Sequence, residues 1–149
     1  MGKTELMEDN KSYLKWQDIR ISQLGFANNL IIALAIALLG YIIDFIQTDN
    51  LILTCFQKIL FWLGCSLILI SIGLGIFVVI NRLEDFKLTA KIARKRETGE
   101  RDGIESDRLK SKRLGEKTWN GFIWQIVTFI VSFLVLITML LISLKDIVT

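Results

Sequence analysis

Residues 59–80 read ILFWLGCSLILISIGLGIFVVI, and no charged residue lies between Lys58 and Arg82. A bilayer span needs about 20 apolar residues, because a helix rises about 1.5 Å per residue across a hydrocarbon core of about 30 Å. A core helix of a soluble protein is rarely this long and this uncharged on every face. This stretch therefore predicts a transmembrane helix.

Two further stretches have the same character. Residues 21–43 lie uncharged between Arg20 and Asp44, and residues 118–144 lie uncharged between Lys117 and Lys145. The whole chain has 149 residues, is 52% hydrophobic and contains no proline to interrupt a helix. The sequence predicts an all-α integral membrane protein that forms a single membrane domain over residues 1–149, with transmembrane helices at 21–46, 59–80 and 119–144.

The basic residues are distributed unevenly around these spans. Of the 18 Lys and Arg residues, all but Lys58 and Lys145 precede the first span or lie between Arg82 and Lys117. Basic flanks remain on the cytoplasmic side of a membrane. We therefore expect residues 1–20 and 81–118 to be cytoplasmic, and the loop 47–58 and the C-terminal tail 145–149 to be external.

The long loop is predicted to form a helical hairpin that extends the second and third spans. Residues 81–98 and 104–118 contain good helix formers, and the polar turn GERDG at 99–103 separates them. Ser106 is a candidate N-cap of the second arm. Apolar residues at helical spacing are expected to pair the arms: Leu83, Phe86, Ala90, Leu109 and Leu114.

Residues 10–23 alternate charged and apolar side chains. This pattern is typical of a short amphipathic helix on the inner membrane surface. The same residues are equally compatible with the first turns of a longer first span.

The basic residues of the loop gather in two clusters, which are Arg94, Lys95 and Arg96, and Lys110, Lys112 and Arg113. Such clusters contact anionic lipid headgroups, or they offer a surface to a cytoplasmic protein partner. Nucleic-acid binding is disfavoured, because neither stacking aromatic residues nor a glycine-rich phosphate loop accompanies them.

Each span has one stripe of small or polar residues at helical spacing. The stripe residues are Asn29, Ala33, Ala37, Gly40 and Asp44 in the first span, Gly64, Ser71 and Gly75 in the second, and Gln125, Thr128 and Ser132 in the third. Such stripes either pack helices closely together or line a water-filled path. Three helices are too few to enclose a wide path, so a pore would require a homo-oligomer.

Catalytic chemistry has little support in this sequence. The chain contains no histidine, and Cys55 and Cys65 are ten positions apart without the spacing of a metal or redox motif. Asp44 sits at the outer end of its span, which favours a hydrated interfacial carboxylate over a proton relay. We expect no catalytic, cofactor-binding or metal site.

The strings NRLEDFKLTAKIARKR at 81–96, LGEKTWNGFIWQ at 114–125 and SQLGFANNL at 22–30 resemble a family of small bacterial three-span membrane proteins of unassigned activity. The matching residues cover about half of the chain. The resemblance implies an inner-membrane source and adds no function.

The sequence favours a non-enzymatic, self-associating membrane protein that forms or perturbs a pore and is regulated through its cytoplasmic hairpin. The alternative is a membrane anchor or scaffold for a cytoplasmic partner.

Overall fold

The computed structural model describes the backbone of residues 2–48, 54–99 and 102–148. It describes the side chains of these residues except 2–18, 20, 48 and 145–148. The described residues form three helices: α1 (Gly2–Thr48), α2 (Cys55–Glu97) and α3 (Ile104–Val148). Each helix contains a window long and apolar enough to cross a membrane. The prediction of an all-helical chain with three candidate spans is thus confirmed, and the three spans indicate a multi-pass membrane protein.

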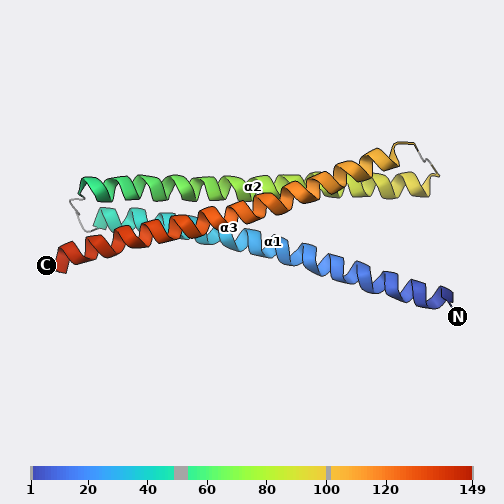
Figure 1. The fold of residues 1–149 in the computed structure, drawn as a ribbon, viewed down its shortest axis with the longest axis horizontal. Coiled ribbons are helices and arrows are strands. Elements are labelled where there is room, and N and C mark those ends of the chain that lie inside the picture. Colours follow the sequence, from blue (N-terminus) through green and yellow to red (C-terminus); the bar gives the residue numbers. More distant parts are fainter. Residues whose placement is uncertain (1, 49–53, 100–101, 149) are drawn as a thin grey trace.

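The helices α2 and α3 form an antiparallel pair along their whole length, and α1 lies against one end of this pair (Figure 1). Toward its N-terminus α1 diverges from the other two helices (Figure 1). The three helices share a core of Ala35 and Ile42 from α1, Ile68 from α2 and Leu136 from α3, all fully buried. Residues 10–23 belong to the continuous helix α1, so the longer first helix is the alternative observed.

A capping box explains why α2 starts at Cys55, four residues before the predicted span. The Thr54 hydroxyl accepts a hydrogen bond from the Gln57 backbone N–H, and the Thr54 N–H donates to Gln57 Oε1 at 2.8 Å. This reciprocal pair satisfies two N–H groups that a helix start would leave unpaired.

Two glycines reverse the chain between α2 and α3. Gly99 and Gly103 have φ angles of 72° and 75°, in the left-handed region that glycine enters without steric cost. The helix α3 begins directly after Gly103, so Ser106 lies in its first turn and the expectation of a Ser106 N-cap is wrong. The Ser106 hydroxyl instead donates to the Gly103 carbonyl at 2.9 Å.

The hairpin, formed by residues 81–97 of α2 and 104–118 of α3, is held together differently from the sequence-based expectation. Leu83, Phe86 and Leu109 are each more than half exposed, so they do not close it. Its buried residues include Ile92, Asp107 and Thr118. Ala90 is exposed as well, whereas Leu114 is partly buried. The two arms therefore meet through the apolar Ile92 together with polar side chains such as Asp107.

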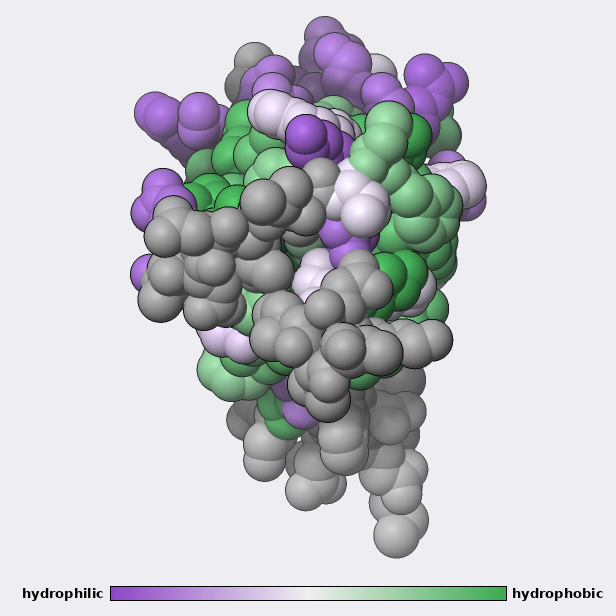
Figure 2. All heavy atoms as spheres, turned by 90° about the vertical axis from the view of Figure 1, so that its left-hand side faces the viewer, coloured by the Kyte–Doolittle hydropathy of each residue, from purple (hydrophilic) through white to green (hydrophobic). Residues whose placement is uncertain are grey.

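The outer surface of the three-helix bundle is largely apolar. Figure 2 shows hydrophobic side chains over much of the bundle surface that is visible beside the grey residues. The aromatic residues near the span ends are among the exposed ones, namely Tyr41, Trp62, Trp119 and Trp124. Lipid solvates such a surface better than water does.

Candidate functional site

The stripes of α2 and α3 face each other and are used in packing. The Ser71 hydroxyl donates to the Gln125 backbone carbonyl at 3.1 Å, and the Ser132 hydroxyl donates to the Gly64 carbonyl at 2.9 Å. Both bonds are buried and link helices across the apolar part of the bundle. Thr128 is partly buried, and its hydroxyl donates to carbonyls of its own helix. Small and hydroxylated residues thus bring two backbones close together.

Glycine is required at two buried positions of α2 where neighbouring side chains pack against the backbone. A Cβ atom at Gly64 would lie 2.5 Å from Leu136 Cδ2, and one at Gly75 would lie 2.6 Å from Gln125 Nε2. Leu136 and Gln125 are both fully buried. Neither position therefore has room for a methyl group without displacing a packed neighbour.

A layer of buried amides joins all three helices at this depth. Asn28 of α1 donates through Nδ2 to the Gly75 carbonyl at 3.4 Å, and a Cβ at Gly75 would lie 2.6 Å from Gln125 Nε2. Asn28 Oδ1 and both side-chain polar atoms of Gln125 have no hydrogen-bond partner among the described residues. Such groups are normally satisfied by ordered water or by a ligand. The layer is a polar site inside an otherwise apolar bundle.

The stripe of α1 lies mostly on the side of its helix away from the other two helices, although Asn29 also borders the cleft between α1 and α2. We call Asn29, Ala33, Ala37, Gly40 and Asp44 the α1 stripe; all five are exposed. The residues of α1 that face the bundle are Asn28, Ala35 and Ile42. At about 100° per residue, these two sets fall on opposite sides of one helix. The five residues of the α1 stripe are therefore exposed on the surface of the single chain.

The end of the hairpin carries a buried ion pair. Lys95 Nζ lies 3.1 Å from Asp107 Oδ2 and Lys91 Nζ lies 3.5 Å from it, while Asp107 is 5% exposed. The hydrogen bond from Lys95, together with the two positive charges, holds the pKa of Asp107 below its ordinary value. Lys95 also donates to the Asp102 carbonyl at 2.9 Å, which ties the turn to α2.

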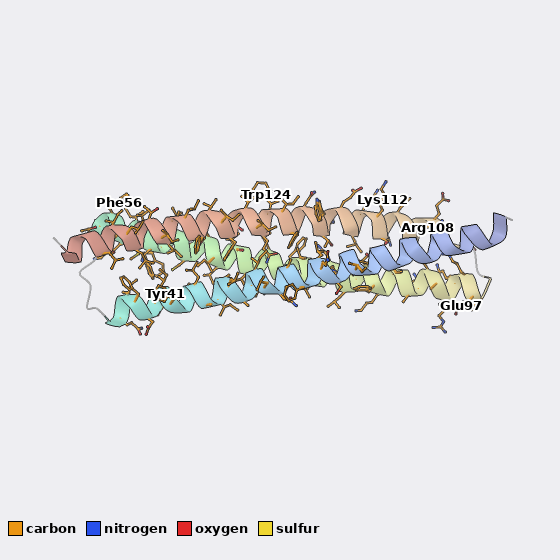
Figure 3. All side chains as sticks on the ribbon, turned by 90° about the horizontal axis from the view of Figure 1, so that it is seen from below. Tyr41, Phe56, Glu97, Arg108, Lys112 and Trp124 are labelled. Atoms are coloured by element: carbon orange, nitrogen blue, oxygen red, sulfur yellow. The ribbon has the colours of Figure 1, made fainter. Side chains whose placement is uncertain are left out.

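The two predicted basic clusters differ in accessibility. Lys95 is partly buried in the ion pair, whereas the remaining members are exposed, namely Arg94, Arg96, Lys110, Lys112 and Arg113. Lys112 and, further along α3, Trp124 point away from the other helices (Figure 3). Lys91, Arg94, Lys95 and Thr98 line a hollow of about 560 Å³. The hairpin thus offers a basic surface to an anionic partner.

Helical spacing in the sequence did not single out three side chains that form buried or partly buried polar contacts. These are Asn28, Arg82 and Asp107. Asn28 neighbours the predicted Asn29, and only the helix rotation seen here tells which of the two is buried. Within the described ranges, no three His, Cys, Asp or Glu side chains form a group able to hold a metal ion.

Comparisons with protein-family models, with curated proteins and with solved structures found no match to this chain.

Proposed function

We propose that this chain is a self-associating protein of the bacterial inner membrane, in which α1 forms the face between copies and borders a path for ions. The observation that carries the proposal is the exposed α1 stripe. A helix side with an amide, a carboxylate and three small residues is costly in lipid unless protein or water covers it. Copies of the same chain arranged around an axis would supply both the protein contact and a water-filled path.

The other two helices support this assignment by exclusion. The stripes of α2 and α3 are occupied by contacts between these helices, including Ser71 with Gln125 and Ser132 with Gly64. They leave α1 as the helix with a polar side to offer. In this proposal the α2–α3 pair is the rigid support, and α1 is the element that neighbouring copies contact.

The hairpin is proposed to be cytoplasmic and to receive a protein or lipid signal. Twelve basic residues lie between Arg82 and Lys117, and retention of such segments on the inner side supports this orientation. The N-terminus would then be cytoplasmic and the C-terminus external.

Self-association is tested with two matched glycine variants. Gly40 and Gly73 are both exposed, and a Cβ at either would meet no atom within 4 Å. Gly40→Leu lies in the α1 stripe, whereas Gly73→Leu lies on the outer surface of α2. Native mass measurement in mild detergent should show oligomers for the wild type and for Gly73→Leu, and mainly monomers for Gly40→Leu. Monomers throughout would reject the proposal.

The path for ions is tested separately with Asn29→Leu. This change removes the amide from the α1 stripe while adding no charge, so assembly should persist and ion flux through protein-loaded liposomes should fall. A protein that assembles but conducts nothing would support the second candidate function, a membrane scaffold. The exposed basic surface of the hairpin favours that candidate, because it can bind an acidic partner without any pore.

A further inference from the structure

Arg82 occupies a particular place in the bundle. It is the first charged residue after the apolar run of α2, and its side chain crosses toward α1 rather than extending into solvent. Its guanidinium donates through Nη2 to the Ile21 carbonyl and lies 5.9 Å from the centre of the Phe86 ring. These contacts use part of a guanidinium that has five N–H donors. The remaining donors are available to an outside acceptor.

The guanidinium borders a cleft between α1 and α2. The cleft has a volume of about 280 Å³, and its lining includes the apolar side chains of Val78, Val79, Leu83 and Phe86. Gly25 forms part of the α1 wall, where a Cβ would come within 2.9 Å of Arg82 Nη1. The cleft is therefore apolar along one helix and cationic at one end.

Within the described residues, Arg82 has a favourable charge interaction with Asp85 but forms no ion pair. No described carboxylate lies within ion-pair distance of it, and the nearby Asp85 accepts a hydrogen bond from the Ser111 hydroxyl instead. Arg82 is partly buried, and a partly buried cation is stabilised by an anion close to it. Asn28 also lines the cleft and is 1% exposed. The partly buried guanidinium therefore favours an anion from outside the described residues.

We propose that this cleft binds one anionic phospholipid, with the phosphate on the Arg82 guanidinium and an acyl chain along Val79. A guanidinium fork matches a phosphate in two parallel hydrogen bonds. The apolar lining favours a lipid over a free phosphate, which has no apolar part to bury there. Arg82 also follows the last apolar turn of the α2 span, at the level where headgroups lie. The site is distinct from the exposed basic clusters of the hairpin.

The test is native mass spectrometry of the delipidated full-length protein, titrated with phosphatidylglycerol and separately with phosphatidylcholine. The wild type should bind one phosphatidylglycerol per chain more tightly than phosphatidylcholine. Arg82→Gln should weaken phosphatidylglycerol binding about tenfold or more, the usual effect of losing a charge-assisted hydrogen bond. Arg113→Gln removes the same charge from an exposed hairpin position and should change this binding little.

A second variant keeps the test decisive if Arg82→Gln does not fold. Val79→Trp fills the cleft but retains the charge, and it should weaken the binding of both lipids. Equal affinity of Arg82→Gln and the wild type for phosphatidylglycerol would overturn the proposal. Displacement of the lipid by millimolar inorganic phosphate would also overturn it, because the site would then bind free anions. Lipid bound per chain is read in monomer and oligomer peaks alike, so failure of self-association leaves this result readable.

Discussion

The glycines of α2 differ in the space around them, and two of them make a matched pair for experiment. A Cβ added at Gly64 would lie 2.5 Å from a buried Leu136 side chain, whereas one at Gly73 of the same helix would meet nothing within 4 Å. Gly64→Ala should lower the free energy of unfolding by about 1–3 kcal/mol through overpacking. The measurement is denaturant unfolding in detergent, followed by tryptophan fluorescence.

Gly73→Ala is the control for this prediction. It adds the same methyl group to the same helix without a clash, so it should be neutral or stabilise by up to about 1 kcal/mol through helix propensity. Equal unfolding midpoints for the two variants would show that α2 and α3 do not pack through Gly64.

The Asp107 ion pair makes the hairpin sensitive to acid. Because the pKa of Asp107 is lowered in the folded chain, the carboxylate contributes stability above its unfolded value of about 3.9. That contribution is lost as the pH falls through the lower folded value. Amide exchange around residues 91–107 should therefore accelerate more steeply below pH of about 4 in the wild type than in Asp107→Asn.

A control separates this ion pair from general charge effects. Asp102→Asn also removes a carboxylate near the turn, but it leaves the backbone carbonyl that Lys95 uses. It should keep the acid response of the wild type. If Asp107→Asn showed the same acceleration of amide exchange in acid as the wild type, the acid sensitivity would not come from the Asp107 ion pair.

The helical spacing of residues in the sequence predicted only some of the contacts between α2 and α3. The stripes placed Ser71 and Gln125 on packing sides of their helices, because small and polar residues repeat at helical spacing. The same reasoning selected Leu83 and Phe86 for the hairpin contact, since apolar residues usually mark the buried side. In this bundle exposed residues are often apolar too, and the buried positions of the hairpin combine Ile92 with the polar Asp107 and Thr118.

At the scale of the helices, α1 differs from the other two in how much of it is covered. The most apolar window of α1 is 11% buried, against 33% for α2 and 22% for α3. Because α1 is attached by fewer buried residues, its backbone amides in the apolar window should exchange faster than those of α2 in detergent. Hydrogen exchange with mass spectrometry measures this difference.

The variant Gly40→Leu extends that prediction. If neighbouring copies cover α1 in the oligomer, this variant should dissociate and expose α1. The amide hydrogens of α1 should then exchange faster still, while those of α2 should change little. Equal protection of the two helices in the dissociated protein would contradict the weak attachment of α1.

Charge boundaries were sufficient to locate the three helices along the sequence but not to set their ends. The start of α2 at Cys55 was readable from Thr54 and Gln57, which have the spacing of a capping box. The unbroken length of α1 was not readable, because an amphipathic surface helix and a lengthened span have the same local pattern.

At the scale of the whole molecule, the predicted orientation can be tested through the cysteines. Cys55 is exposed at the start of α2, while Cys65 is buried. In a Cys65→Ser background, an impermeant maleimide added to intact spheroplasts should label Cys55, because this end is expected to be external. Labelling that requires permeabilisation would reverse the orientation, and denatured protein serves as the positive control for reactivity.

The uninterrupted course of α2 has a mechanical consequence. Residues 59–80 span about 33 Å and residues 81–97 about 26 Å at 1.5 Å per residue, and one straight helix connects them without a proline hinge. Paired with α3, α2 is a stiff rod whose arm before Arg82, residues 55–81, is longer than its arm after Arg82, residues 83–97. If the rod pivots at Arg82, a partner that pulled the glycine turn sideways would move the opposite end in the other direction and by a larger distance. Ile42 of α1 belongs to the same core cluster as Ile68 of the longer arm, so force applied at the turn would reach α1 without any local unfolding.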